Sequence, residues 1–339
     1  MKKLLLPFLC IGLLFASCSD DDDSPKNGGI NDAKEYIDQN REKAKEEVVI
    51  NTSDLPKTIT LDEGVKITIK EGTFTKDGQP VEGEITLEIY EMLKPSSIIF
   101  AGTNTNYAGY IYPGYLETDG FIYINAKQDG EYLDEYLSKN LTISIPTDKE
   151  DGTQTELWIG TENAGNDDDP QFAWVDMNEK ALNWNDMGED GNQQYSQVWA
   201  RDGVFQFSFG KLGWCNCDVI WGQGKEKTTV TVALTGNVGE LASYLGYSGD
   251  TFVFFCGKGA PIVAQLYTKV DETTVKSYDN SMPIGAEGKL IAFSITEGKF
   301  SFASKNIVIE KDMTVTLNLK EVSKADLDKE IKAIDGYSK

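Results

Sequence analysis

The sequence contains no histidine among its 339 residues, and this absence excludes several classes of chemistry. Without an imidazole there is no general base for a histidine-dependent triad and no histidine ligand for zinc. Catalysis would have to rely on carboxylates, lysine, tyrosine or cysteine. The sequence also lacks a Walker motif and a dinucleotide-binding fingerprint. We therefore predict a protein that is not an enzyme and that needs no cofactor.

Basic residues and long apolar segments are also scarce. Lysine and arginine number 32 against 55 aspartates and glutamates, which gives a formal net charge of -23. Such a charge repels nucleic acid and anionic membrane surfaces, so neither is expected as a partner. After the N-terminal segment, no apolar stretch approaches the roughly 20 residues of a membrane-spanning helix. With so many carboxylates, two neighbouring ones are no indication of a glycosidase site.

The N-terminus has the three parts of a secretory signal peptide, which we assign to residues 1–17. Two lysines precede an apolar stretch at 4–15 that is too short to span a bilayer, and small residues follow it. The pattern Phe-Ala-Ser-Cys ending at Cys18 resembles a lipobox. This resemblance implies that Cys18 carries acyl chains and becomes the first residue of a mature lipoprotein. The alternative is a secreted protein in which Cys18 has no such role.

An acidic run follows directly and consists of Ser19, Asp20, Asp21, Asp22 and Asp23. It resembles the export tag with which some anaerobic Gram-negative bacteria send lipoproteins to the outer face of the outer membrane. The resemblance implies a lipid-anchored outer-membrane protein that faces the outside of the cell. A solvated spacer is the simpler alternative. We expect an acidic tether and stalk over residues 18–56, with a short charged helix at 31–49.

From residue 57 the apolar residues recur with a period of two, which is typical of strands with one wet face. The pattern holds in "KTITL" (57–61), "VKITIK" (65–70), "EITLEIYE" (84–91), "GFIYINAK" (120–127) and "LTISIP" (141–146). Asp62-Glu63-Gly64 and Asp77-Gly78 mark breaks between the first strands, and Asp129-Gly130 is predicted to form a tight turn.

Residues 57–146 resemble the spectrin-binding β-sandwich of ankyrins and netrin receptors, as it recurs in bacterial surface lipoproteins. The likeness lies in "GVKITIKEGTFTKDGQPVEGEITLEIYE", "GYLETDGFIYINAKQDGEYL" and "LTISIP". It implies a module that binds other proteins and has no catalytic residues.

A second series of strands begins after residue 224. Its first and last segments, "VTVAL" and "MTVTLNL", resemble the small immunoglobulin-like modules of bacterial surface proteins. Ser323 then begins a helix with Leu327, Ile331 and Ile334 on one face, which is expected to dock on a sheet.

The predicted fold class is all-β. It consists of two antiparallel β-sandwich domains, at 57–223 with a loop-rich acidic insertion and at 224–339, with a short N-terminal charged helix and a short C-terminal helix.

Two kinds of ligand site are candidates in the loop-rich region between the two series of strands. Acidic, glycine-containing loops favour calcium, and the candidate ligands are Asp148, Asp151, Asp186 and Asp190. Solvated loops are the alternative. Tryptophan rings that stack on sugars are the second candidate, at Trp158, Trp174, Trp184 and Trp199. The alternative for these rings is that they cap a sandwich core.

The segment "FGKLGWCNCDVIW" (209–221) is the most distinctive of the mature chain, and it contains Cys215 and Cys217. Two residues apart on a strand, both side chains point to the same face, so a disulfide between them would be strained. Two alternatives remain: one of these cysteines pairs with Cys256, or all three serve as small buried apolar residues. No histidine is available to lower the pKa of a catalytic thiol.

Two functional hypotheses follow. The first is a non-enzymatic, lipid-anchored cell-surface protein that binds a protein or a glycan, or acts as an accessory subunit. The second is a glycan-processing surface lipoprotein that uses a pair of carboxylates between residues 148 and 190 and nearby aromatic rings.

Overall fold

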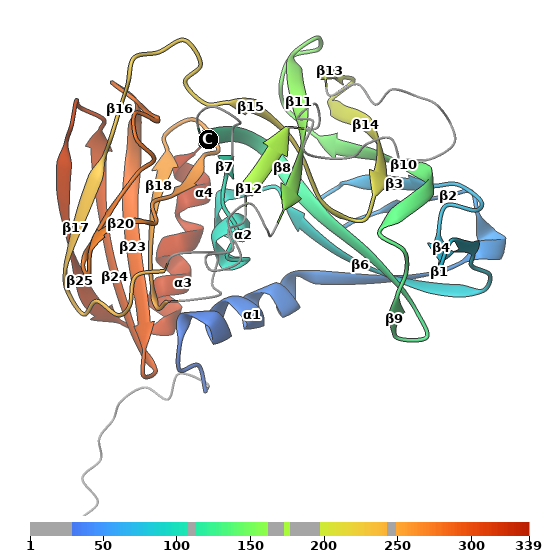
Figure 1. The fold of residues 1–339 in the computed structure, drawn as a ribbon, viewed down its shortest axis with the longest axis horizontal. Coiled ribbons are helices and arrows are strands. Elements are labelled where there is room, and N and C mark those ends of the chain that lie inside the picture. The colour runs from blue at the N-terminus through green and yellow to red at the C-terminus, as the bar shows by residue number, and fades with distance from the viewer. Residues whose placement is uncertain (1–28, 108–112, 162–172, 177–196, 243–248, 339) are drawn as a thin grey trace, which may run out of the picture.

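The computed structural model describes residues 29–107, 113–161, 173–176, 197–242 and 249–338. Within these residues the protein is an all-β, sandwich-like structure with two β units and a few short helices (Figure 1). Helices α1 to α4 lie between the two units, which stand side by side. The predicted fold class is therefore confirmed.

The first unit has one continuous hydrogen-bonded strand order, β1-β6-β8-β7-β12-β11-β13-β14-β10-β3-β2. Strand β15 also pairs with β8 and β11, and β9 pairs with β8. The strands are β1 (Lys45–Asn51), β2 (Lys57–Thr60), β3 (Lys66–Ile69), β4 (Thr75–Lys76), β5 (Gln79–Pro80), β6 (Glu84–Met92), β7 (Asn106–Tyr107), β8 (Gly114–Gln128), β9 (Glu131–Tyr132), β10 (Tyr136–Pro146), β11 (Gln154–Thr161), β12 (Ala173–Asp176), β13 (Gln197–Arg201), β14 (Val204–Lys211) and β15 (Gly213–Ile220).

The alternating segments of the sequence form these strands because one side of each enters a common core. In β10, Leu141, Ile143 and Ile145 are buried, and the residues between them are half-buried. The tight turn predicted at Asp129-Gly130 is present, and the break at Asp77-Gly78 has the same backbone conformation. Asp129 and Gly130 have φ values of 51° and 82°, and Asp77 and Gly78 have 52° and 73°, as a two-residue hairpin turn requires.

The N-terminal charged segment is helical only in its first part. Helix α1 (Ala33–Ala44) begins where the Asp32 carboxylate accepts a hydrogen bond from the Glu35 N–H at 2.8 Å. From Lys45 onward the chain becomes strand β1, which pairs with β6 along its whole length. Residues 30–56 are thus part of the folded body and not of a free stalk. Such a short charged segment fits a helical and an alternating period equally well, and pairing with β6 decides between them.

The second unit has the strand order β19-β18-β23-β24-β25-β17-β21-β20. Its pairs are antiparallel except β17 and β25, which run parallel. The strands are β16 (Lys227–Thr228), β17 (Thr231–Gly236), β18 (Thr251–Gly257), β19 (Val263–Gln265), β20 (Thr268–Asp271), β21 (Thr274–Lys276), β22 (Met282–Pro283), β23 (Glu287–Thr296), β24 (Lys299–Val308) and β25 (Thr314–Val322).

The C-terminal helical segment forms α3 (Lys324–Lys332) and α4 (Ile334–Tyr337), and the Ser323 hydroxyl caps α3 by accepting from the Asp326 N–H at 3.1 Å. Leu327, Ile331 and Ile334 are fully buried, as their spacing predicts. The two other short helical segments are η1 (Thr52–Asp54) and α2 (Pro95–Phe100).

A continuous apolar core joins the two units. It combines side chains of helices α1, α2 and α3 with residues of both sheets, among them Phe121, Trp174, Phe252, Phe293 and Leu327. Backbone contacts reinforce it: the Thr105 N–H donates to the Val263 carbonyl at 2.9 Å. The side-chain amide of Asn106 adds two hydrogen bonds to Gln265. Its nitrogen donates to the Gln265 carbonyl and its oxygen accepts from the Gln265 N–H, each at 2.9 Å. The units are therefore packed and hydrogen-bonded into one body.

Candidate ligand-binding cleft

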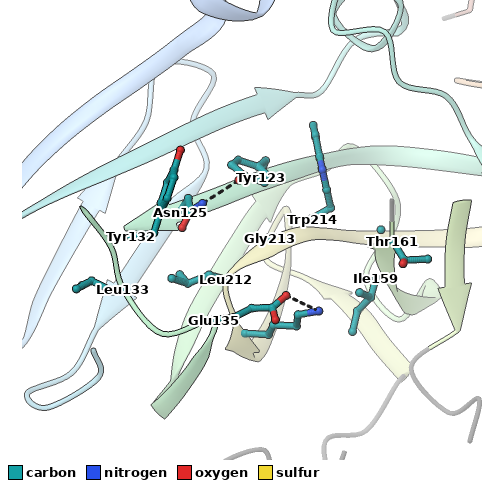
Figure 2. Close-up of a pocket in the computed structure, with 12 residues that line it drawn as sticks. Tyr123, Asn125, Tyr132, Leu133, Glu135, Ile159, Thr161, Leu212, Gly213 and Trp214 are labelled. Atoms are coloured by element: carbon teal, nitrogen blue, oxygen red, sulfur yellow. Dashed lines mark hydrogen bonds and ion pairs between the residues drawn. The ribbon is translucent and has the colours of Figure 1, made fainter. Parts of the chain in front are cut away.

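A cleft with a volume of about 460 Å³ opens on the first unit (Figure 2). It lies where β8, β9, β11 and the junction of β14 and β15 meet. Its lining residues are Tyr123, Asn125, Tyr132, Leu133, Glu135, Ile159, Gly160, Thr161, Lys211, Leu212, Gly213 and Trp214. Its size falls within the range of about 300–1,000 Å³ that small-molecule sites occupy.

The Asp129-Gly130 turn builds one lip of the cleft. It folds β9 back on β8, so that Tyr132 pairs with Lys127 and the Leu133 N–H donates to the Ala126 carbonyl at 3.0 Å. The Tyr132 ring stands at the rim and is 57% exposed. The Lys127 ammonium lies 4.4 Å from the centroid of this ring and holds it from one side.

Aromatic side chains form one wall of the cleft. Tyr123 on β8 is the cross-strand neighbour of Tyr90 on β6 and of Trp214 on β15. The Tyr123 ring centroid lies 4.9 Å from that of Trp214 and 5.6 Å from that of Tyr90. Packed rings of this kind give a rigid apolar surface that a ligand can contact without ordering flexible side chains.

The polar groups of the cleft are fixed in position. The Asn125 amide donates to the Tyr123 hydroxyl at 2.9 Å, and its oxygen accepts from the Ala126 N–H at 2.8 Å. The Lys211 ammonium lies 2.9 Å from a Glu135 carboxylate oxygen and 5.7 Å from the centroid of the Tyr136 ring. The charges of Lys211 and Glu135 compensate one another.

The basic residue behind the rim is also compensated. Lys127 donates to Glu88 at 2.8 Å, and this hydrogen bond raises the pKa of the Lys127 ammonium. The rim thus carries ammonium groups without an unbalanced positive charge.

Of the four tryptophans proposed as sugar platforms, the three that the structure describes, Trp158, Trp174 and Trp199, do not line the cleft. Trp158 and Trp174 are buried, and their indole N–H groups donate to the carbonyls of Asp218 at 3.2 Å and Asn104 at 2.8 Å. For these two residues the alternative interpretation holds, in which tryptophan rings pack in the core. Trp199 on β13 is 41% exposed and does not line the cleft. Trp184 lies outside the described residues.

Of the four aspartates proposed as calcium ligands, the two that the structure describes, Asp148 and Asp151, are not part of a metal-binding group. Asp151 accepts a hydrogen bond from the Asp202 N–H at 2.9 Å and so caps the turn between β13 and β14. Asp148 follows the end of β10, and Asp186 and Asp190 lie outside the described residues. Among the residues that the structure describes, no group of three acidic or cysteine side chains is arranged to hold a metal ion.

The aromatic and polar residues of the cleft were not predicted from the sequence, although two features of the sequence pointed to them. Tyr123 and Asn125 alternate with buried residues in the segment 120–127 and lie on its wet face. Trp214 belongs to the distinctive segment 209–221. Nothing in the local pattern shows that these two segments pair with one another.

The three cysteines at 215, 217 and 256 are buried free thiols. Cys215 and Cys217 share one face of β15, as predicted, and pack in the core of the first unit, whereas Cys256 packs in the core between the units. Burial raises the pKa of each thiol. This separation explains why neither cysteine of β15 pairs with Cys256.

We expect these three thiols to resist iodoacetamide in the folded protein at pH 8, because burial both shields them and disfavours the thiolate. All three should react after denaturation in guanidinium chloride, as counted by mass spectrometry. Rapid alkylation of the native protein at any of these positions would contradict their placement in the two cores.

Fold and cleft together define a sandwich-like β protein with a cleft lined partly by aromatic side chains. No protein-family model, curated protein or solved structure matches the chain. In the described part of the chain, no helix combines the length and the apolar character needed to cross a membrane.

Proposed function

We propose that this is a non-enzymatic, lipid-anchored protein of the outer cell surface that binds a ligand in the cleft of its first β unit. The aromatic cleft is the observation that carries the binding role, because concave sites with apolar walls and a few fixed polar groups are where small ligands bind. The lipobox-like sequence at Cys18 and the acidic run at 19–23 support the anchored surface location.

The groups around the cleft favour binding over hydrolysis. A glycosidase needs two carboxyl groups on opposite sides of the scissile bond, about 5–10 Å apart. Among the described residues that line the cleft, Glu135 is the carboxylate, and it forms an ion pair with Lys211. An ion-paired carboxylate without a second one opposite cannot supply both the acid and the base of this reaction.

The position of the cleft is also suited to a tethered receptor. The N-terminal side of the chain enters the fold at α1, which contacts β23 of the second unit. The cleft belongs to the first unit, on β8, β9, β11 and β15 (Figure 1). No residue of α1 lines the cleft, so the point where the tether joins the fold lies outside it.

The anchoring half of the proposal is tested at Cys18. Cys18→Ala should abolish incorporation of a labelled fatty acid and release the protein from membranes, because the acyl chains supply the membrane affinity. Replacing Asp20, Asp21, Asp22 and Asp23 by asparagine should keep the fatty acid and remove accessibility to protease added to whole cells. A wild-type protein that stays unlabelled, or that protease cannot reach on intact cells, would refute the surface lipoprotein.

A further inference from the structure

The cleft presents the two kinds of surface that a sugar needs. A pyranose ring has an apolar C–H face, which packs on an aromatic ring, and hydroxyl groups around its edge. Tyr123 supplies the apolar wall, and Trp214, which is only 6% exposed, packs against the Tyr123 ring and supports it. Asn125, whose amide is fixed by two hydrogen bonds beside Tyr123, and the ion pair of Glu135 and Lys211 supply the polar groups of the cleft.

Aromatic rings continue from the cleft onto the surface. Tyr132 at the rim is 57% exposed and Tyr136 nearby is 45% exposed. A lysine lies over each ring. The Lys127 ammonium nitrogen is 4.4 Å from the centroid of the Tyr132 ring, and the Lys211 nitrogen is 5.7 Å from that of Tyr136. Exposed aromatic rings in fixed positions beside a cavity extend the contact surface beyond one sugar unit, which favours a chain of sugars over a single one.

The charges select a neutral ligand. Lys211 is compensated by Glu135 and Lys127 by Glu88, so the cleft has no uncompensated ammonium among these groups for an acidic sugar or a phosphate. The whole chain has a formal net charge of -23, which repels anionic polymers over longer distances.

We infer, as an extension of the binding role proposed above, that the cleft binds a neutral oligosaccharide. One sugar ring packs against Tyr123, whose ring is supported by the largely buried Trp214, with its hydroxyl groups toward Asn125 and Glu135. The next ring packs over Tyr132. The aromatic rings supply most of the affinity, and the polar groups set the orientation.

The test is isothermal titration calorimetry of the detergent-solubilised lipoprotein with neutral hexasaccharides (α- and β-glucan, xylan and mannan fragments) and with an oligogalacturonate. We expect at least one neutral series to bind. Tyr132→Ala should then weaken binding tenfold or more, and Tyr132→Phe should keep it within threefold. Tyr132 is mostly exposed, so this loss is not expected to come from unfolding, and circular dichroism checks the fold.

Trp199→Ala is the matched control, since Trp199 is an exposed aromatic residue of the same unit outside the cleft. It should leave binding unchanged. An equal loss in both variants, or tighter binding of the oligogalacturonate, would overturn the inference. Absence of binding to every neutral series would overturn it too, while fatty-acid labelling and protease accessibility report separately on the surface lipoprotein. If no sugar bound, but a protein partner bound the wild type and not Tyr132→Ala, the oligosaccharide would be refuted as the ligand and the binding role of the cleft would be supported.

Discussion

Replacing Tyr36 by alanine should lower the free energy of unfolding by about 3–5 kcal/mol, the range for removing a large aromatic side chain from a core. Tyr36 is fully buried on α1, between the two β units. Its ring packs edge-on against Phe100, Phe293 and Phe300, with centroid distances of 6.3, 6.2 and 5.9 Å. Because these rings come from α2 and from the second unit, the loss should weaken the whole body. Urea denaturation followed by fluorescence and far-ultraviolet circular dichroism measures it.

Comparing Tyr36→Phe with Tyr36→Ala separates the contribution of the hydroxyl group to stability from that of the ring. The Tyr36 hydroxyl donates to Asp328 at 2.6 Å, and burial raises its pKa, so it stays protonated as a donor. Tyr36→Phe keeps the ring contacts and should cost about 1 kcal/mol for the lost hydrogen bond. Tyr136→Ala, at an exposed position, should cost less than about 0.5 kcal/mol. If Tyr36→Ala were as harmless as Tyr136→Ala, α1 would not hold the two units together.

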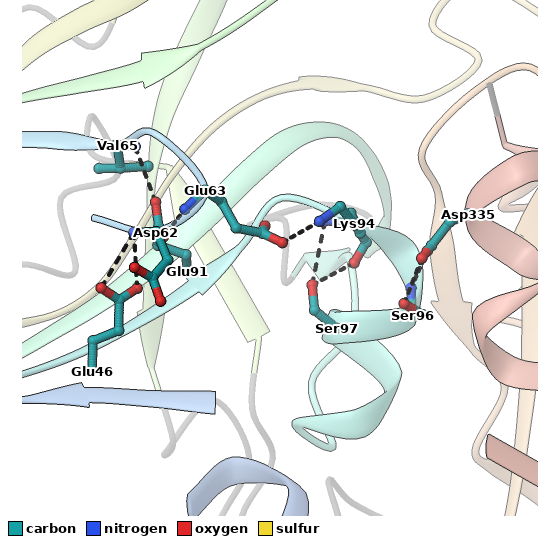
Figure 3. A network of polar contacts seen from close by, with 9 residues as sticks. All are labelled: Glu46, Asp62, Glu63, Val65, Glu91, Lys94, Ser96, Ser97 and Asp335. Carbon is teal, nitrogen blue, oxygen red and sulfur yellow. Dashed lines mark hydrogen bonds and ion pairs between the residues drawn. The ribbon is translucent and has the colours of Figure 1, made fainter. Parts of the chain in front are cut away.

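The raised pKa of Glu91 should by itself lower the stability of the protein by about 2–3 kcal/mol between pH 5 and pH 8. Its carboxylate accepts from the N–H groups of Glu63 at 2.6 Å and Val65 at 3.0 Å (Figure 3). Burial and the neighbouring Glu46 nevertheless raise the pKa of Glu91 from its ordinary 4.5 to about 7. A carboxyl group that keeps its proton longer in the folded state stabilises that state below pH 4.5. This contribution is lost as the pH rises through 7.

Burial acts in the same direction on two other acids. It raises the pKa of Asp119 from 3.8 to about 6. It also raises the pKa of Asp218, which is completely buried on β15. Their contributions are therefore also present at low pH and decrease as the pH rises. Urea unfolding at pH 5, 6, 7 and 8 measures the sum.

Glu46→Gln isolates the Glu46 and Glu91 pair. It removes the like charge beside Glu91, so the pKa of Glu91 should fall and the protein should be about 1–2 kcal/mol more stable at pH 8 than the wild type. At pH 5 the two should be nearly equal. Glu47→Gln is the control, since Glu47 is the next residue of β1 and faces solvent, beside Lys45. A wild-type stability that rises from pH 5 to pH 8 would show that Glu91 is ionised throughout.

Much of the β architecture was predictable because it depends on local patterns. A period of two in 57–61, 65–70 and 84–91 gave β2, β3 and β6 close to their observed bounds. Asp129-Gly130 was predictable because its left-handed backbone is one that few other residue pairs adopt. The helix at 31–49 was only half right, since the choice between helix and strand after Ala44 depends on pairing with β6, about 40 residues away.

The cleft was not predictable for the same reason. Its wall joins Tyr123 to Trp214, which meet only because β8 and β15 pair. Trp158 and Trp174 are just as aromatic in the sequence, yet they lie in the core between the units, and Trp214 belongs to the same core although it also lines the cleft. The sequence shows that an aromatic residue is present at a position, but not whether its ring is exposed. Burial, which a local pattern of loops and strands does not specify, decides whether it faces a ligand or the interior.

The amino-acid sequence by itself determined the strands, the Asp-Gly turns, the acidic charge and the exclusion of imidazole chemistry, because these follow from side-chain period, backbone preference and composition. Only the tertiary structure decided that α1 and α3 fill a shared core between two β units, and that one group of aromatic residues forms a cleft while another is buried. Both outcomes depend on contacts between residues far apart in the chain, and such contacts leave no local signal.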